Sequence, residues 1–438
     1  IIAPSPAECV ATVAAGRRMD NPARRAIVRP MTQQTFDTDL VIVGGGLNGP
    51  MVALAAAQAG LTATVIDALP RDTRAKPDFD GRAYALAQGS VRMLAALGLW
   101  DTLAGHAQPM NEIKVSDGRV GDAGVFLGLH FDSAELERGP MGHMLEDRFL
   151  RRALLDAMDA SPLVTTLADA RVVAQDSTGG AARVTLQDGR SVNGRLLVGA
   201  DGRQSGTARR AGIRRTGWDY RQSALVCAIA HEKPHHGVAH QLFLPSGPLA
   251  ILPLPDNRSQ IVWSEARAQA EAVQALDEAG YLAVLRPRFG DFLGDISLAG
   301  RRYTYPLNLT LANAFVADRL ALVGDAAHGV HPIAGQGLNA GMRDVAALAH
   351  VLGHAARRGE DFASPAVLAR YQRWRRFDTA TLAVATDTFN RLFSNDNPIL
   401  RAGRDLGMAA FQAVPEIRRA FIREAAGLTG DMPDLMRG

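Results

Sequence analysis

Three glycines at positions 44, 46 and 49, in the run GGGLNG, are the first residues whose spacing points to a chemistry. They match the pattern GxGxxG, in which Gly44 would allow a tight turn, Gly46 would let the backbone approach a pyrophosphate, and Gly49 would let a helix pack closely on a strand. Asp67 follows 18 residues after Gly49, where a carboxylate can accept a hydrogen bond from a ribose hydroxyl. This motif predicts a bound dinucleotide and leaves FAD and a nicotinamide nucleotide open.

Two later motifs share one form, an apolar run that ends in glycine and aspartate. They are LVGADGRQS at residues 197–205 and LVGDAAH at residues 322–328, and the second leads into HPIAGQGLN at residues 331–339. The glycine-rich bend in that last run is expected to open a helix, whose free backbone N–H groups can serve a phosphate or an acceptor-rich ring. Each motif alone is compatible with a structural turn. Three strand-end motifs in this order indicate one nucleotide site.

The elements that must position these motifs predict an α/β fold. The apolar run at 39–43, the alanine-rich stretch at 51–59 and the β-branched run at 62–66 predict strand, helix and strand, the unit of a parallel sheet. Further helices are predicted at 81–97, 146–158 and 338–352, with a mostly helical end after 364. Strands at 172–186 and 195–198 are predicted to return to the first sheet, and the α/β pattern to resume at 320–323. Between them, proline and glycine turns separate short strands at 241–244, 249–254 and 260–263.

Composition indicates a globular protein and excludes several classes. The 438 residues are 47% hydrophobic and 21% charged, enough for two packed domains. The formal net charge is +3 and no block of Lys and Arg is long enough to follow a phosphate backbone, so we expect no nucleic-acid partner. Cys9 and Cys227 build neither a disulfide framework nor a CxxC metal site, which fits a cytoplasmic setting. The most apolar stretch, 50–66, is too short and too interrupted to read as a membrane span.

Residues 1–30 differ from the rest, because they carry five arginines and no sustained apolar period. A signal peptide would have a basic start followed by an apolar run, and that order is not found here. Our hypothesis is that the native protein begins at Met31, and that the upstream piece is disordered or non-native.

The order GxGxxG, GADG and GDAAH with HPIAGQGLN resembles the class A flavoprotein monooxygenases, which share the para-hydroxybenzoate hydroxylase fold. Within that class, four stretches resemble the ubiquinone-biosynthesis hydroxylases (UbiH/VisC type). They are GRAYAL at 81–86, FLPSGPLAILPLPDNRSQIVW at 243–263, HPIAGQGLNAGMRDVAAL at 331–348 and RLFSN at 391–395. The resemblance covers about residues 38–428.

The resemblance implies a Rossmann-like FAD-binding domain with an inserted β-rich substrate domain and a helical C-terminus. On this basis we divide the chain into a leader at 1–37, a discontinuous FAD-binding domain at 38–216 and 306–363, a substrate domain at 217–305, and a helical region at 364–438.

The resemblance also carries the family's site residues over to this chain. For the adenosine half of FAD, the set is Gly44, Gly46 and Gly49 at the pyrophosphate and Asp67 at the ribose. Arg82, in the Asp-x-Arg position, would contact a phosphate or the flavin; Arg148 is also included, and Asp201 and Gly202 belong to the motif shared by FAD and nicotinamide. For the flavin half, Gly324 and Asp325 lie at the ribityl hydroxyls, followed by Gly337, Leu338 and Asn339, of which the last two present backbone N–H groups to the flavin. Pro332, Gly335 and Gln336 would line the loop beside the reacting ring, with no acid or base assigned. The chain departs from the family at Glu146-Asp147, where the family often has Glu-Asn.

The implied reaction is hydroxylation of the aromatic ring of a polyprenyl-phenol intermediate of ubiquinone biosynthesis. FAD would be the bound cofactor, NAD(P)H a transient co-substrate, and O2 the oxidant, through a flavin C4a-hydroperoxide. No second complete GxGxxG unit is found, which favours transient docking of the nicotinamide. Two alternatives stay open: a flavin reductase or dehydrogenase of the same fold, and a non-catalytic flavoprotein subunit of a biosynthetic complex.

Two patterns are set aside, so that the sequence assigns no metal site. HEKPH at 231–235 spells the zinc-protease motif HExxH, but Pro234 lies within it and the region is rich in strands, so a surface turn is the better interpretation. His328 and His331 are three apart within the expected flavin loop. Residues 397–426 mix arginines with apolar side chains, which fits either a helix packed on the catalytic body or a helix that contacts a partner or the inner face of the membrane.

Overall fold

The computed structural model describes residues 36–117, 128–135, 139–177, 180–330, 335–393 and 415–437. The expectation for the leader falls almost wholly outside these residues. Everything described belongs to one compact unit, Phe36–Gly438.

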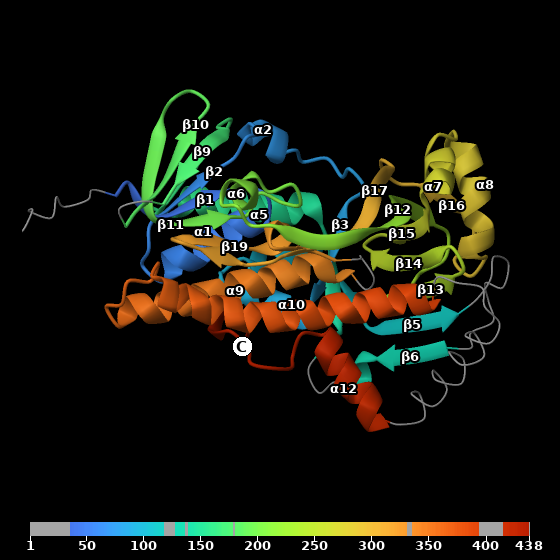
Figure 1. The fold of residues 1–438 in the computed structure, drawn as a ribbon. Coiled ribbons are helices and arrows are strands. Elements are labelled where there is room, and N and C mark those ends of the chain that lie inside the picture. The colour runs from blue at the N-terminus through green and yellow to red at the C-terminus, as the bar shows by residue number, and fades with distance from the viewer. Residues whose placement is uncertain are drawn as a thin grey trace, which may run out of the picture. The chain divides into compact units, whose positions relative to one another are not determined.

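The first sheet has eight strands and carries the predicted βαβ unit (Figure 1). Its main path runs in the order β18 (Val316–Ala317), β19 (Leu320–Leu322), β11 (Ser191–Gly199), β1 (Thr38–Val43), β2 (Ala63–Ile66) and β8 (Val164–Leu167), with β10 (Ala182–Leu186) beside β11 and β9 (Val172–Asp176) beside β10. β1 pairs in parallel with both β2 and β11, and β11 pairs in parallel with β19. The predicted parallel sheet and its returning strands are confirmed.

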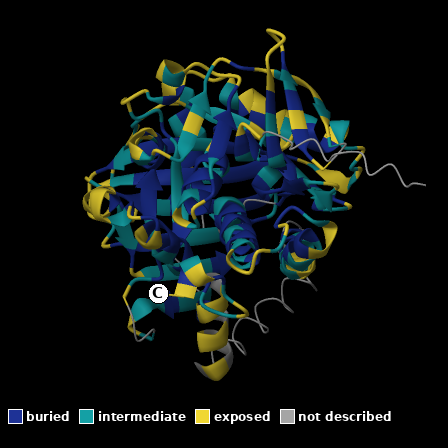
Figure 2. Cartoon of the chain, turned by 90° about the vertical axis from the view of Figure 1, so that its left-hand side faces the viewer, coloured by how far each residue is buried: buried dark blue, intermediate teal, exposed yellow. Residues whose placement is uncertain are grey.

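Helices cover this sheet because its strands are apolar on both faces. α1 (Asn48–Gln58) packs against α9 (Gln336–Arg357) and α5 (Asp147–Ala160), and α10 (Pro365–Phe393) runs beside α9 (Figure 1). One core contains Leu40 of β1, Met51 of α1, Met342 of α9 and Tyr371 of α10, all fully buried. Buried residues gather around the strands in Figure 2. The predicted helices at 51–59, 146–158 and 338–352 are confirmed, as is the helical C-terminal region.

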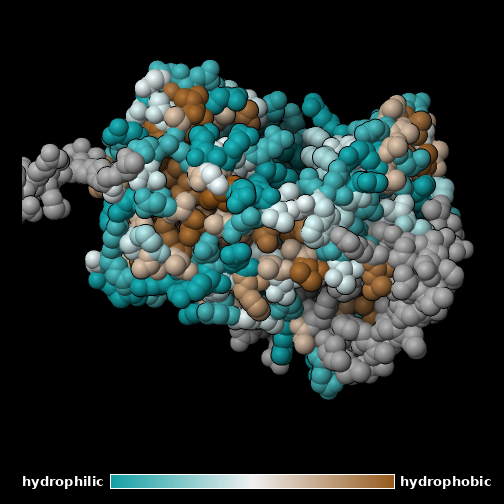
Figure 3. Space-filling model, viewed as in Figure 1, coloured by the Kyte–Doolittle hydropathy of each residue, from teal (hydrophilic) through white to brown (hydrophobic). Residues whose placement is uncertain are grey.

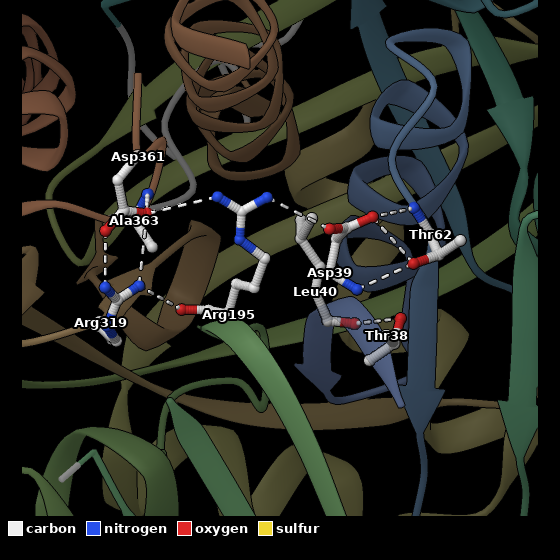
Figure 4. Close-up of polar contacts among 8 residues, drawn as sticks. All are labelled: Thr38, Asp39, Leu40, Thr62, Arg195, Arg319, Asp361 and Ala363. Carbon is white, nitrogen blue, oxygen red and sulfur yellow. Dashed lines mark hydrogen bonds and ion pairs between the residues drawn. The ribbon is translucent and has the colours of Figure 1, made fainter. Parts of the chain in front are cut away.

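Polar side chains join the strands where β1, β2 and β19 begin (Figure 4). Oδ2 of Asp39 accepts hydrogen bonds from the backbone N–H and the hydroxyl of Thr62, both at 2.9 Å. The Arg195 guanidinium lies 3.6 Å from Asp39 and 3.6 Å from Asp361, and Arg319 donates to Asp361 at 2.6 Å. Because the strands are parallel, their carboxyl ends meet at the opposite edge of the sheet, which is the edge where nucleotide ligands bind.

The second sheet has nine strands and includes the three short strands predicted between 241 and 263. Its order is β20 (His328–Gly329), β17 (Tyr303–Ala312), β12 (Arg215–His231), β15 (Arg258–Ala266), β14 (Gly247–Leu254), β13 (Val238–Leu244), β5 (Glu112–Asp117) and β6 (Gly128–Asp132), with β16 (Ile296–Leu298) beside β12. Two helices, α7 (Arg267–Gln274) and α8 (Glu278–Phe289), contribute to its core, where Trp263, Tyr281 and Phe289 are fully buried. Since β5, β6 and β20 come from outside 217–305, this sheet reaches beyond the segment predicted as a substrate domain, and the division into domains stays a prediction.

A third sheet overturns part of the helix predicted at 81–97. Its order is β3 (Ala83–Ala87), β7 (Gly142–Glu146) and β4 (Gln108–Met110), and the helix α3 (Gln88–Ala96) begins only after β3. β3 pairs antiparallel with β7, from Ala83 opposite Glu146 to Ala87 opposite Gly142. Pairing with a strand more than 50 residues away outweighs the helix propensity of an alanine-rich segment, which is a weak local preference.

The remaining elements are short or follow α10. They are α2 (Arg71–Arg74), α4 (Trp100–Leu103), α6 (Gly206–Arg210), α12 (Pro415–Ala425), α13 (Asp434–Arg437) and the 3₁₀ turns η1 (Ala104–His106), η2 (Ser133–Glu135) and η3 (Gly324–Ala326). In the described parts of the chain, no helix is both long and apolar enough to cross a membrane.

Candidate cofactor site

The three glycines that define the GxGxxG motif lie in different environments. Gly44 has φ of +111°, and a Cβ there would overlap the carbonyl oxygen of Ala200; a Cβ on Gly49 would overlap the carbonyl oxygen of Gly44 itself. A Cβ on Gly46, in contrast, would meet no atom of the described residues within 4 Å. Gly44 and Gly49 are therefore required by the fold, and Gly46 leaves its backbone accessible beside the N-terminus of α1.

Asp67, at the end of β2, closes this loop from one side. Its Oδ2 accepts from the N–H of Gly45 at 2.6 Å, and its Oδ1 accepts from the N–H of Leu69 at 2.7 Å. Each carboxylate oxygen retains a second lone pair, so these bonds leave capacity for a ribose hydroxyl. The assignment of Asp67 to the ribose stays a prediction.

Arg74, at the end of α2, is a residue that the sequence analysis missed. Its Nη1 donates to the carbonyl of Gly45 at 3.0 Å and lies 3.9 Å from Oδ2 of Asp67. Its Nε and Nη2 are buried and have no hydrogen-bond partner among the described residues. Burial lowers the pKa of Arg74, and the charge of Asp67, which would raise this pKa, only partly offsets the effect of burial. Unsatisfied buried donors are costly, so this guanidinium is suited to an acceptor-rich ligand at the glycine loop.

The GADG loop at the end of β11 lies directly against Gly44, since the N–H of Ala200 donates to the carbonyl of Val43 at 2.8 Å. Oδ2 of Asp201 accepts from the N–H and the hydroxyl of Thr207, both at 2.9 Å, and its Oδ1 accepts from the Ser205 hydroxyl at 2.5 Å. Gly202 has φ of +78° and open space around it. The Asp201 carboxylate thus holds the start of α6, and its role toward a nucleotide stays a prediction.

The glycine-aspartate turn after β19 is held by two arginines. Nε of Arg203 donates to Oδ2 of Asp325 at 3.1 Å, and Nη2 of Arg215 donates to the backbone carbonyl of Asp325 at 2.8 Å. The Asp325 side chain is 40% exposed. A Cβ on Gly324, whose φ is +59°, would overlap the side-chain amide of Asn48 at the start of α1. The turn therefore sits against the helix that follows the GxGxxG loop, with its carboxylate available to a ligand.

A buried charged cluster lies beneath this turn and was not predicted. Asp344 of α9 is fully buried. Its Oδ2 accepts a hydrogen bond from the N–H of Gly324 at 2.9 Å and lies 2.6 Å from Nε2 of His328. Its Oδ1 accepts a hydrogen bond from Nε of Arg375 at 2.8 Å. Burial favours protonation of Asp344, but the charges of His328 and Arg375 prevail and lower its pKa. The cluster ties the turn to α9 and α10.

The first turn of α9 follows Gly335, which has φ of +63°, and is bonded to β3 and the start of α3. Oδ1 of Asn339 accepts from the N–H of Ala87 at 2.9 Å and from the Ser90 hydroxyl at 2.7 Å, and its Nδ2 donates to the carbonyl of Ala85 at 2.8 Å. A Cβ on Gly337 would meet no atom of the described residues within 4 Å. The Asn339 side chain is thus structural, and the start of the helix is accessible near Gly337. Gln336 and Leu338 lie in the same turn, whereas Pro332 lies outside the described residues.

Arg82, immediately before β3, lies between two carboxylates. Its Nη2 is 2.6 Å from Asp80 and 3.4 Å from Asp147, and its Nε donates to Asp80 at 2.9 Å. Burial alone would lower the pKa of Arg82, but the hydrogen bond to Asp80 and the charge of Asp147 outweigh burial, so the pKa is raised above its ordinary value. The Tyr84 hydroxyl donates to Asp147 at 2.8 Å, and burial together with that carboxylate raises the pKa of Tyr84. Arg82 stays charged and Tyr84 stays protonated at neutral pH.

Arg148, at the start of α5, is paired within the protein. Its Nε donates to Oε2 of the buried Glu146 at 2.7 Å, and the other oxygen of Glu146 lies 2.9 Å from Arg258. The Arg148 guanidinium also lies 4.5 Å from the centre of the Phe149 ring. The structure thus gives Arg148 a local role, and its contact with the cofactor stays a prediction.

HEKPH at 231–235 is not helical. His231 ends β12 and contacts the Ser259 hydroxyl at 3.1 Å, and His236 has φ of +53°. The two histidines of the motif therefore do not lie on one helix face.

These residues fit a bound FAD in three respects. The glycine, GADG and glycine-aspartate loops contact one another at the carboxyl ends of β1, β11 and β19, and the start of α9 joins them to the Arg82 segment. The backbone is accessible at Gly46 and Gly337, each near a helix N-terminus, which suits phosphate and an anionic ring edge. Two buried donors of Arg74, Nε and Nη2, lack partners among the described residues. When bound, FAD supplies redox chemistry that the side chains here do not provide.

Comparisons with known proteins agree with this site. The family model described as an FAD binding domain matches residues 37–385. A ubiquinone hydroxylase, UbiL, of Rhodospirillum rubrum is 44% identical over 403 residues, which cover 91% of this chain and 92% of that one. The 3-demethoxyubiquinol 3-hydroxylase of Escherichia coli is 36% identical over 402 residues, covering 91% of this chain and 100% of that one.

A solved structure, p-nitrophenol 4-monooxygenase PnpA from Pseudomonas putida DLL-E4, superposes with a TM-score of 0.75 at 21% identity, covering 90% of this chain and 98% of that one. This likeness shows the fold. Fold and site together define a class A flavoprotein monooxygenase, an FAD-dependent enzyme. At the level of family, the chain belongs to the ubiquinone-biosynthesis hydroxylases, as the sequence resemblance predicted.

Proposed function

We propose that this chain hydroxylates the aromatic ring of a polyprenyl-phenol intermediate of ubiquinone biosynthesis, with NAD(P)H and O2 as co-substrates. The observation that carries the proposal is the convergence of three distant loops and the α9 N-terminus on one cofactor site. The substrate class is supported by relatives whose names state ubiquinone hydroxylation and which match this chain over almost its whole length.

The protein's own part in this reaction is to bind, to orient and to hold charge. We propose that Asp325 holds the ribityl hydroxyls and that the N–H groups of Leu338 and Asn339 face the flavin edge, where they would stabilise negative charge. Arg82, which Asp80 and Asp147 keep charged, would pair with a phosphate or the flavin. Gly335 and Gln336 would lie beside the reacting ring.

The test is complementation of bacterial strains that each lack one ring hydroxylase, with quinone intermediates identified by mass spectrometry. Rescue of one strain, with loss of its accumulated intermediate, is expected. The purified protein should also oxidise NAD(P)H faster with substrate and release a hydroxylated product. Oxidation without hydroxylated product would indicate a reductase instead. Bound FAD without any substrate-stimulated oxidation would indicate a non-catalytic subunit.

We also propose peripheral contact with a membrane, because a polyprenyl tail partitions into lipid. Two large apolar side chains on α10, Phe377 and Val384, are 75% and 67% exposed, and their spacing of seven residues places them on one helix face. Apolar patches show on the side of the molecule that α10 crosses (Figure 3). The predicted segment 397–426 falls largely outside the described residues.

Liposome flotation tests this contact. The double variant Phe377→Asp/Val384→Asp should float less with anionic vesicles than the unchanged protein, and removal of residues 397–438 tests the C-terminal segment separately. Failure of the unchanged protein to float would refute the membrane proposal, and binding that neither change reduces would refute these two contact sites. Either result leaves the hydroxylase proposal intact.

A further inference from the structure

Two histidines of α9 and one aspartate of α13 lie close together where α13 packs against α9. His350 and His354 are four residues apart and so share a helix face. Their ring centres are 4.2 Å apart. Asp434 approaches from α13, and one ligand atom from each of the three side chains lies within 4.8 Å of the others. The sequence analysis did not single out these residues.

Both imidazoles lie close to the same carboxylate oxygen. Nε2 of His354 lies 2.8 Å from Oδ2 of Asp434, and Nδ1 of His350 lies 3.0 Å from that oxygen. Nδ1 of His350 is buried, and none of its contacts with the described residues has the geometry of a hydrogen bond. In a tetrahedral zinc site with bonds of about 2.0–2.1 Å, ligand atoms lie about 3.3 Å apart. A shift of a few tenths of an ångström would therefore bring each of the two nitrogen–oxygen distances to zinc-ligand spacing.

The surrounding residues hold the three side chains in place. Nη1 of Arg437 lies 3.2 Å from Oδ1 of Asp434, which directs the other oxygen toward the histidines. The His350 ring meets the edge of Trp374 at 5.3 Å between centres, and Nε1 of Trp374 donates to the carbonyl of Asp431 at 3.2 Å. Supporting contacts of this kind are typical of metal sites, because they fix the ligands before the ion arrives.

The charge and space around the cluster also admit a cation. A cavity of about 370 Å³ is lined by His350, His354 and Trp374 together with Val351, Arg358 and Arg370, which leaves room for water ligands. The two lining arginines are both paired with Glu360, at 2.6 and 2.9 Å.

We propose that His350, His354 and Asp434 bind one divalent transition-metal ion of the Zn²⁺ type, with water completing the coordination. The ion fastens α13 to α9. Met436, two residues beyond Asp434, is buried in the main core, so the ion and the core hold the same short helix. An ion that binds only the folded chain stabilises it by mass action.

The experiment uses the full chain with its flavin, purified without a histidine tag and freed of metal by a chelator. Calorimetric titration with Zn²⁺ should show one equivalent bound, and Co²⁺ should give the visible absorption of a low-symmetry site. His354→Gln and Asp434→Asn should each weaken Zn²⁺ binding at least about tenfold. His130→Gln is the matched control, because His130 of β6 also pairs with a carboxylate, Glu112, at 2.8 Å, yet should leave Zn²⁺ binding unchanged.

Absence of Zn²⁺ binding, or equal binding after either substitution in the cluster, would overturn the proposal. A second measurement needs no variant. Zn²⁺ should protect His350 and His354 of the unchanged protein from modification by diethyl pyrocarbonate, as mapped by mass spectrometry of peptides. Equal modification of these two residues with and without Zn²⁺ would also overturn it.

Discussion

Replacing Asp344 by alanine should both destabilise the protein and weaken its hold on FAD. Asp344 is 0% exposed and makes three contacts of 2.6–2.9 Å, with Gly324, His328 and Arg375. Its removal leaves buried partners without their counter-charge, a change that costs about 3–5 kcal/mol. Because Arg375 keeps an ion pair with Asp378, we expect the lower end, about 3 kcal/mol.

The assay is urea unfolding of the flavin-loaded protein, followed by circular dichroism, together with FAD affinity from flavin fluorescence. Asp378→Ala is the matched control: it removes the other carboxylate of Arg375, at 2.6 Å, but Asp378 is 37% exposed, so a loss of no more than about 1 kcal/mol is expected. If Asp344→Ala and Asp378→Ala lose the same stability, or if FAD affinity is unchanged in Asp344→Ala, the buried cluster does not support the turn.

The pH dependence of this contribution follows from the sign of the shift. Burial alone would raise the pKa of Asp344, but His328 and Arg375 lower it in the folded protein below its value in the unfolded chain. The stabilisation is therefore fully present above the unfolded pKa of about 3.9 and is lost as the pH falls through the folded pKa. The stability difference between the unchanged protein and Asp344→Ala should accordingly shrink in strong acid.

Three other substitutions test the cofactor site. Asp325→Ala should lose bound FAD, measured by the flavin absorbance of the purified protein, because the proposed ribityl acceptor is removed. Gly49→Ala should prevent folding, measured as loss of soluble protein, since its Cβ would overlap the carbonyl of Gly44, whereas Gly60→Ala, in open space at φ of +79°, should cost only about 1–2 kcal/mol. Arg74→Met should weaken FAD binding about tenfold or more, measured by fluorescence titration, because buried donors to the ligand are lost.

The elements around the first glycine loop could be predicted because their signals are local. A short apolar run, three spaced glycines and a carboxylate at the end of the next strand specify β1, α1 and β2 within 30 residues. β3 could not be predicted in the same way, because Ala83–Ala87 becomes a strand only by pairing with β7. α7 was overlooked because the surrounding strands dominated the pattern, although Ala270 and Val273 are spaced as on a helix and are buried.

The site residues that could not be predicted from the sequence also depend on contacts between distant parts of the chain. Asp344 meets His328 and Arg375 across 16 and 31 residues, and no periodicity connects three residues that lie on a short strand and two helices. Arg74 lies seven residues beyond Asp67 in a segment without a motif, so only the folded chain shows its guanidinium at Gly45. The sequence thus identified the loops that surround the cofactor site, and the structure was needed for the residues that support them.

Two aspartates in similar sequence motifs show what the structure adds to the prediction of function. Both Asp201 and Asp325 follow an apolar strand that ends in glycine, and their local sequence patterns do not show which of them is used by its own loop. Asp201 accepts three hydrogen bonds from Ser205 and Thr207 within its own loop, so its removal would release the start of α6. Among the described residues, the Asp325 side chain has one partner, Arg203, and its carboxylate is partly exposed. Its removal leaves the backbone of the turn supported by the bonds of Gly324 and Arg215. Of the two, Asp325 is therefore the carboxylate with more capacity left for a ligand, and loss of flavin without loss of fold is the result that this reasoning requires of it.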